Sequence, residues 1–323
     1  MGNNTKGALV ALLSFAIYAT SDATVKSLGG IYSPFQLIFF TQLFSFPLVM
    51  LMMISDPKPG NLRPVHPWWV ALRTASAVIA GFCSFFAFSN MPLAQVYAII
   101  FASPLIITLL AIPVLGEKVG VHRLGAVIVG LVGVIVVIRP GSSALSAGHI
   151  AALGAAFAGG FNSIIVRKIG NEERPVVLLL YPMIANFVLM ACALPFVYIP
   201  MPIEHLASVG ALSVLGWLGG LFIIRAYRLG EAVIVAPMQY SQIIWATIYG
   251  YLFFNEMLDG GTILGTAIII ASGLYIVLRE TWSGRSANRP VLNTKMRPET
   301  AAMPRPSLLA RFTHRNDEKP SGS

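Results

Sequence analysis

Charge is scarce in this chain of 323 residues: 11% of the residues are charged, 56% are apolar, and the mean hydropathy is +0.75. A soluble domain carries about 25% charged residues, so this chain has too few polar groups to cover a surface that faces water. The shortage argues against a cytosolic enzyme, a DNA-binding domain and a disordered chain. It favours a protein whose main solvent is lipid.

Cysteines and enzyme motifs are also scarce. Cys83 and Cys192 each lie within a long apolar run, where we expect buried, unpaired side chains. The sequence has no G-x-x-x-x-G-K-[ST] loop for ATP and no H-E-x-x-H metal motif. The five histidines form no cluster with metal-ligand spacing. We therefore expect neither a metal nor another cofactor.

The net charge is +9, which in a soluble protein would indicate a nucleic-acid partner. Here the basic residues lie between apolar stretches and form no compact patch, so we expect no nucleic acid. Residues 281–323 are rich in Pro, Ser, Arg and Lys. That composition is typical of a disordered, basic cytoplasmic tail.

Ten apolar runs are long enough to cross a bilayer core of about 30 Å as helices. They cover approximately residues 7–28, 34–54, 68–90, 92–115, 121–139, 147–169, 175–199, 206–229, 232–254 and 261–279. The predicted fold class is therefore an all-α integral membrane protein with ten transmembrane helices. Basic residues in short loops concentrate on the side that holds both termini, which predicts cytoplasmic N- and C-termini in a cell (inner) membrane.

The two halves of the chain resemble each other at an offset of about 140 residues. Leu115-Gly116-Glu117 matches Phe254-Asn255-Glu256, and each motif precedes a glycine-rich run. An odd number of helices in each copy reverses the orientation of the second copy. We therefore predict two inverted five-helix repeats, residues 1–140 and 141–280, an architecture common in secondary transporters with sites near the midplane.

Asp22 is the most informative residue within an apolar run. A carboxylate inside a bilayer is costly unless it is paired, protonated or facing water. One interpretation places Asp22 and Tyr18 on the wall of a transport pathway, where the carboxylate binds substrate or carries a coupling proton. The other pairs Asp22 with Lys26, one helical turn later, near the outer interface.

The ninth run offers a second polar face. Within an arc of about 120° it places Gln239, Gln242, Trp245 and Tyr249. Amides and an indole at mid-depth suit a planar solute that forms hydrogen bonds. The alternative is polar packing between helices, which is common in membrane bundles.

The repeat register favours a different face of the same run. The fourth run carries a stripe formed by Tyr97, Phe101, Pro104 and Thr108. Its equivalents in the ninth run are Ala236, Tyr240, Ile243 and Thr247. If equivalent faces line the pathway, Tyr240 lines it and Gln239 does not, so both alternatives stay open. Pro104 lacks a backbone donor and favours a kink at this depth.

These features resemble the EamA-type branch of the drug/metabolite transporter superfamily over roughly residues 5–280. The resemblance rests on the ten runs, the duplicated unit, the Gly116-Glu117 and Asn255-Glu256 junctions, and Pro104. The second copy differs at Ile243, near an expected proline, and at Asn255, where glycine is usual. The resemblance implies a secondary transporter of a small organic metabolite that works by alternating access.

Within that superfamily the sequence is most similar in style to the branch that includes riboflavin importers and S-adenosylmethionine carriers. Riboflavin import is the leading substrate prediction; S-adenosylmethionine, an amino acid or another metabolite, imported or exported, is the alternative. An integral-membrane enzyme would need acids, bases or metal ligands gathered at one depth, and Asp22 is isolated. A scaffold would not need a duplicated bundle. We therefore expect no enzymatic activity.

Overall fold

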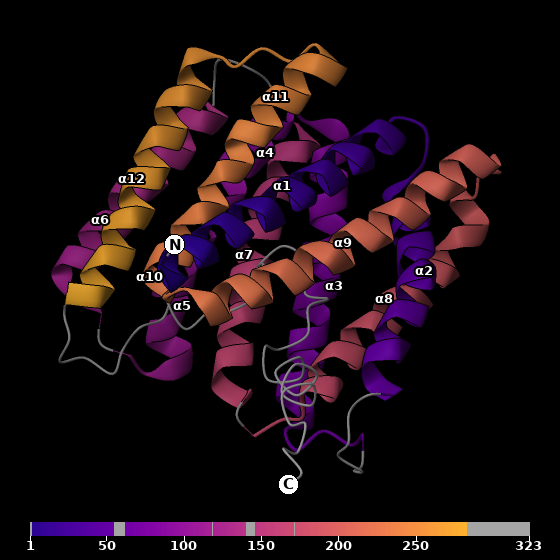
Figure 1. Ribbon diagram of the computed structural model, residues 1–323, viewed down its shortest axis with the longest axis horizontal. Coiled ribbons are helices and arrows are strands. Elements are labelled where there is room, and N and C mark those ends of the chain that lie inside the picture. Colours follow the sequence, from indigo (N-terminus) through magenta and orange to yellow (C-terminus); the bar gives the residue numbers. More distant parts are fainter. Residues whose placement is uncertain (1, 55–61, 118, 140–145, 171, 283–323) are drawn as a thin grey trace, which may run out of the picture.

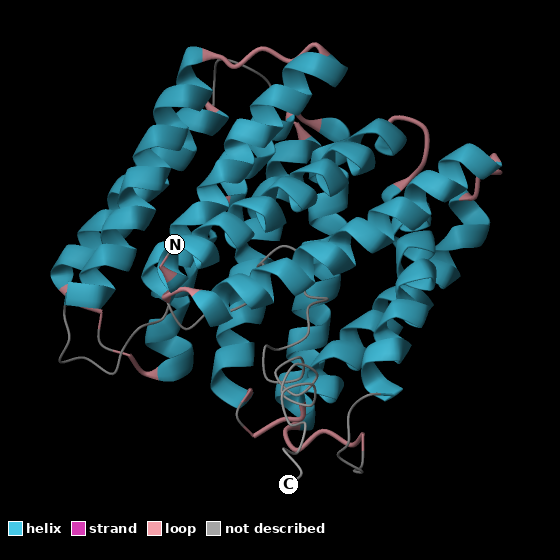
Figure 2. Cartoon of the chain, viewed as in Figure 1, coloured by secondary structure: helices cyan, strands magenta, loops and turns pink. Residues whose placement is uncertain are grey.

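The computed structural model describes residues 2–54, 62–117, 119–139, 146–170 and 172–282. Within these ranges every regular element is a helix, which confirms the all-α class (Figure 2). The helices are α1 (Asn3–Gly29), α2 (Pro34–Ile54), α3 (Pro67–Asn90), α4 (Leu93–Ile100), α5 (Ser103–Leu115), α6 (Val121–Ile138), α7 (Ala147–Ile169), α8 (Pro175–Val197), α9 (Ile203–Leu229), α10 (Ala232–Val235), the 3₁₀ helix η1 (Ala236–Ser241), α11 (Gln242–Phe254) and α12 (Gly260–Trp282).

Eight helical segments in the described part of the chain are long and apolar enough to cross a membrane. The α4–α5 pair counts as one of them. The apolar part of α2, Pro34–Met50, is shorter, and η1 interrupts the run 232–254. Eight spans are therefore supported, and the full count of ten stays a prediction. The predicted tail lies almost entirely outside the described residues.

The fourth and ninth runs are broken helices and not single kinked ones, which corrects the sequence-based prediction. Phe101 and Ala102 separate α4 from α5, and Pro104 lies at the start of α5. Proline fits a first helical turn because the N–H it lacks would have no partner there. In the second half, η1 precedes α11 in the same way. The segments α5 and α11 have equal lengths of 13 residues.

Each half packs against the other through equivalent helices. Helix α1 packs along α9 as α7 packs along α3, α6 packs along α12, and α2 along α8 (Figure 1). The closest approaches are also equivalent: Gly7 of α1 lies against Gly230 after α9, and Gly148 of α7 lies against Met91 after α3. The duplication detected in the sequence is therefore present in the packing.

The two copies run in opposite directions. Lys26, near the end of α1, donates a hydrogen bond to the Met91 carbonyl just after α3. Gly148, at the start of α7, contacts the Met91 side chain. Helix α7 therefore begins where α1 ends. Since α1 and α7 are equivalent in the repeat, the second copy is inverted relative to the first.

Glycine lets α6 and α12 approach closely at the junction of the two copies. A Cβ on Gly265 of α12 would lie 2.6 Å from the Gly133 carbonyl oxygen of α6, and a Cβ on Gly133 would lie 2.9 Å from the Gly265 carbonyl oxygen. Neither helix backbone can yield without separating the pair. Contact of this kind stabilises membrane helices through close van der Waals packing.

We expect Gly265→Ala to destabilise the protein by about 1–3 kcal/mol, because overpacking forces the backbones apart. The matched control is Gly125→Ala on α6, where an added Cβ meets nothing within 4 Å. That change should be neutral or stabilising, because alanine favours a helix by about 1 kcal/mol over glycine. Thermal midpoints of the purified variants in detergent test the difference, and equal midpoints would contradict it.

Candidate functional site

Three polar side chains from three helices meet inside the bundle. Tyr97 Oη of α4 donates a hydrogen bond to Asp22 Oδ2 of α1. Gln242 Nε2, at the start of α11, donates to Tyr97 Oη over 3.4 Å. All three side chains are buried, with Asp22 only 6% exposed. A carboxylate, a phenol and a carboxamide therefore form one chain of hydrogen bonds that joins the two halves; we call it the central network.

Aromatic rings extend the central network toward the broken segment of the second half. The Tyr97 ring lies edge-on to Phe88 at 5.3 Å and 5.9 Å from Phe101, and Phe101 is edge-on to Tyr240 at 5.1 Å. Tyr240 fits because its hydroxyl lies where a side chain on Gly273 of α12 would be. The break after α4 thus faces the 3₁₀ helix η1 across an aromatic contact.

The structure assigns the two proposed faces of the ninth run one contact each. Gln242 joins the central network, and Tyr240 reaches it through Phe101. Gln239 lies half-buried in η1. Trp245 is half-buried and packs on Tyr249 at 6.2 Å. The two predicted stripes are therefore not alternatives in the geometry, because the break at η1 turns residues from both toward Tyr97.

The remaining predicted residues have local partners. Tyr18 is 1% exposed, and its ring packs against Gly219 of α9. The Thr108 hydroxyl donates to the Pro104 carbonyl of its own helix at 2.9 Å. Thr108 and Pro104 therefore satisfy each other within α5.

Lys26 does not pair with Asp22, which corrects one of the two interpretations of that carboxylate. The Lys26 Nζ lies 2.6 Å from Glu256 Oε1 and 5.3 Å from the centre of the Phe254 ring. Glu256 Oε2 in turn accepts a hydrogen bond from the Leu93 N–H at 2.9 Å. Lys26 thus joins α1 and α4 of the first half to the end of α11 in the second half.

An equivalent ion pair closes the opposite end of the bundle. Arg167 of α7 binds Glu117, which follows α5, and both side chains are mostly buried. The neighbouring Lys168 donates to the Val114 carbonyl at 2.8 Å and lies over the Trp69 ring. In each pair the base ends the first helix of one half and the acid follows the corresponding broken run of the other. Since the halves are inverted, the pairs lie at opposite ends.

The local backbone explains why the two glutamates occupy equivalent places. Gly116 and Asn255 both adopt left-handed conformations, with φ of 69° and 52°. The next N–H then bonds the carbonyl six residues earlier, Glu117 to Ala111 and Glu256 to Gly250, as in a Schellman cap. Asparagine is the residue that most readily replaces glycine in this conformation, so the sequence difference at Asn255 leaves the junction intact.

Sequence reasoning treated these glutamates as interface or capping residues and missed their ion pairs. The repeat register held the signal, because it aligned Lys26 with Arg167 and Glu117 with Glu256. Within the described ranges, no group of three or more His, Cys, Asp or Glu side chains could hold a metal ion. The central network can bind a cationic or hydrogen-bonding solute and can exchange a proton at Asp22.

Comparison with known proteins agrees with this architecture. An S-adenosylmethionine uptake transporter of Rickettsia prowazekii (strain Madrid E) is 27% identical over 274 residues, which cover 83% of this chain and 91% of that protein. A pseudopaline exporter of Pseudomonas aeruginosa (strain UCBPP-PA14) is 24% identical over 281 residues, covering 86% and 97%. One crystal structure superposes with a TM-score of 0.57 at 19% identity over 87% of this chain and 99% of that chain, which shows a shared fold.

The family comparison matches the two halves separately. The EamA-like transporter family matches residues 5–139 and again residues 146–278. Those ranges are the two copies seen in the sequence and in the helix packing. The chain is thus a multi-pass membrane transporter and belongs to the EamA-like transporter family.

Proposed function

We propose that this protein moves a cationic, amino-acid-derived metabolite of the S-adenosylmethionine type across the membrane by alternating access. The observation that carries the proposal is the buried Asp22 carboxylate, bonded to Tyr97 and linked to Gln242 at the junction of the inverted halves. A buried carboxylate is costly in a bilayer and is retained at substrate or ion pathways. It offers a partner to a substrate cation or to a coupling proton.

The two ion pairs support alternating access. Lys26–Glu256 and Arg167–Glu117 each connect the two halves, one at each end of the bundle. Opening one end while the other stays closed requires breaking one pair and keeping the other. Equivalent pairs give the two states similar energies, which an exchange between inward and outward forms needs.

Loop charge supports an orientation. The end with Glu117 and Arg167 carries more of the short-loop basic residues than the end with Glu256 and Asp259. By the positive-inside rule we place the first end in the cytoplasm and the second outside, in a bacterial inner membrane. Both termini then lie in the cytoplasm.

Substrate charge separates the two named candidates. The names of the relatives reported above give riboflavin no support, and its isoalloxazine ring carries no cation for Asp22. S-adenosylmethionine carries a sulfonium and an ammonium group, and two inverted halves joined by one buried acid suit such a cation. We therefore favour S-adenosylmethionine over riboflavin as the substrate.

We expect the purified protein in liposomes to take up radiolabelled S-adenosylmethionine with saturation, and unlabelled S-adenosylmethionine to compete. Riboflavin at equal concentration should compete weakly, because it lacks a cationic group. Protein-free vesicles supply the background. Riboflavin flux without S-adenosylmethionine flux would overturn the substrate assignment.

A further inference from the structure

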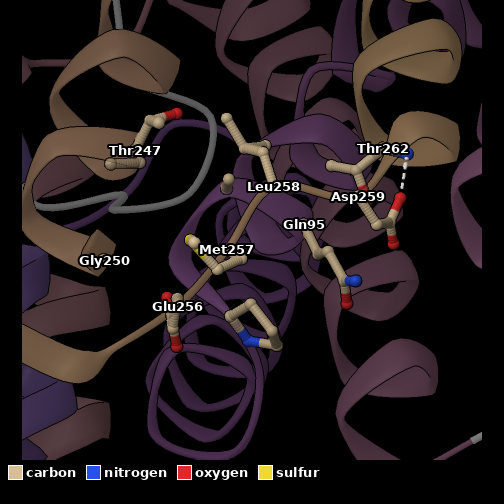
Figure 3. A pocket seen from close by; sticks show the side chains of 11 residues that line it. Gln95, Thr247, Gly250, Glu256, Met257, Leu258, Asp259 and Thr262 are labelled. Carbon is tan, nitrogen blue, oxygen red and sulfur yellow. Dashed lines mark hydrogen bonds between the residues drawn. The ribbon is translucent and has the colours of Figure 1, made fainter.

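A pocket of about 270 Å³ lies at the end of the bundle where α11 connects to α12 (Figure 3). It takes its walls from the start of α4, from α11, and from the segment that leads into α12. The polar residues among those that line it are Gln95, Thr247, Glu256, Asp259 and Thr262. The central network does not contribute to this lining.

The pocket presents hydrogen-bond acceptors and negative charge. Glu256 and Asp259 supply carboxylates, and Figure 3 shows the Gln95 carboxamide on the same side as Asp259. Their cationic partners, Lys26 at 2.6 Å from Glu256 and Arg139 at 2.8 Å from Asp259, are not among the lining residues. The counter-charges therefore lie behind the walls, and the acids lie at the surface of the pocket.

Asp259 is held in its charged form. Partial burial acts to raise its pKa, but hydrogen bonds from the Thr262 N–H and the charge of Arg139 outweigh burial and lower the pKa below its usual value. The carboxylate of Asp259 is 40% exposed, so it remains accessible.

Thr262 supplies an independent sign of a missing polar partner. The residue is only 1% exposed and lines the pocket, and its hydroxyl makes no hydrogen bond of good geometry. A buried hydroxyl without a partner costs about 1–3 kcal/mol. A polar group in the pocket would reduce that cost.

We propose that this pocket is an entry site that binds the compact cationic group of the substrate, a sulfonium or substituted ammonium, before the substrate reaches Asp22. The inference rests on the proposed function for the substrate class. The volume is below the roughly 300–1,000 Å³ of sites that enclose whole drug-sized ligands, so the pocket takes one group of the substrate. Glu256 belongs both to this pocket and to the ion pair with Lys26.

That double role links binding to opening. A cation in the pocket shares the Glu256 carboxylate with Lys26 and weakens the contact that holds α1 to the end of α11. The site would therefore favour release of its own end of the bundle when a cationic substrate arrives.

The test uses a cysteine reporter at the rim. Met257 lines the pocket and is 79% exposed. Met257→Cys, made in full-length protein with Cys83→Ala and Cys192→Ala, is labelled with a membrane-impermeant maleimide in the presence of trimethylsulfonium. The neutral control is tert-butanol, which has a similar size. We expect trimethylsulfonium to slow labelling and tert-butanol to leave the rate unchanged.

Three variants locate the effect. Asp259→Asn should weaken protection by about tenfold, since a charge-assisted contact is worth about 1.5–3 kcal/mol. Gln95→Leu should also weaken it and touches neither ion pair, so it guards against a folding defect in Asp259→Asn. Glu117→Gln removes the equivalent acid at the opposite end and should leave protection unchanged.

The outcomes separate this inference from the proposed function. Absence of protection, equal protection by tert-butanol, or protection unaffected by both pocket variants would overturn the entry site even when S-adenosylmethionine flux is intact. Protection that depends on Asp259 and Gln95, in a protein without S-adenosylmethionine flux, would support the cation site and overturn the substrate assignment.

Discussion

Asp22→Asn should reduce substrate uptake by at least about 30-fold, since removing one partner of a buried charged contact costs about 2–5 kcal/mol. Asparagine keeps the size of the side chain and can still accept a hydrogen bond from Tyr97. Packing should therefore survive, and the loss isolates the negative charge. Uptake is measured in proteoliposomes at equal amounts of inserted protein.

Two controls sharpen this prediction. Glu204→Gln removes an acid at the exposed start of α9, and it should leave uptake unchanged. Tyr97→Phe keeps the charge of Asp22 but removes the hydroxyl that donates to it, and it should cause a smaller loss than Asp22→Asn. Unchanged uptake by Asp22→Asn would remove Asp22 from the mechanism.

Exchange experiments distinguish the two roles of Asp22. If the carboxylate binds substrate, Asp22→Asn should lose both net uptake and exchange of labelled for unlabelled substrate. If it carries a coupling proton, the variant should keep exchange and lose accumulation driven by a pH gradient. The two results exclude each other, so one set of vesicles assigns the role.

The helices could be predicted from sequence because a bilayer leaves long apolar runs few alternatives. The breaks before Ser103 and Gln242 could not, because those runs are as apolar as the intact ones and hydropathy does not record which turn is broken. Asn255 was a departure from the family pattern in the sequence, and the left-handed backbone there shows that the departure has no structural consequence.

The candidate site was predicted as separate residues and not as a network. Helical periodicity gives the face on which Asp22, Tyr97 or Gln242 lies, but it does not say which helix that face meets. The pairing of Lys26 was assigned to Asp22 because the two are one turn apart in sequence. The inverted packing of the halves instead brings Glu256, 230 residues later, to the same place.

Reversing the charges of one ion pair should restore a protein that either single reversal inactivates. Lys26→Glu places two acids together at the outer end, and Glu256→Lys places two bases there, so each should lose most uptake. In the double variant the attraction returns with opposite polarity, and uptake should recover by at least about tenfold over either single variant, because close charge pairs couple by about 1.5–7 kcal/mol. Recovery should be incomplete, since a lysine side chain in place of Glu256 could not accept the hydrogen bond that the carboxylate receives from the Leu93 N–H.

The inverted repeat supplies a mismatched control for that rescue. Lys26→Glu combined with Glu117→Lys has the same composition as the paired double variant, but its two changes lie at opposite ends of the bundle. It should show no recovery, because the new charges cannot meet and Arg167 loses its acid as well. Equal uptake by the two double variants would mean that net charge and not pairing controls transport. Recovery only in the paired variant would show that a direct contact between the two halves, at the end where α1 meets α11, is required for the transport cycle.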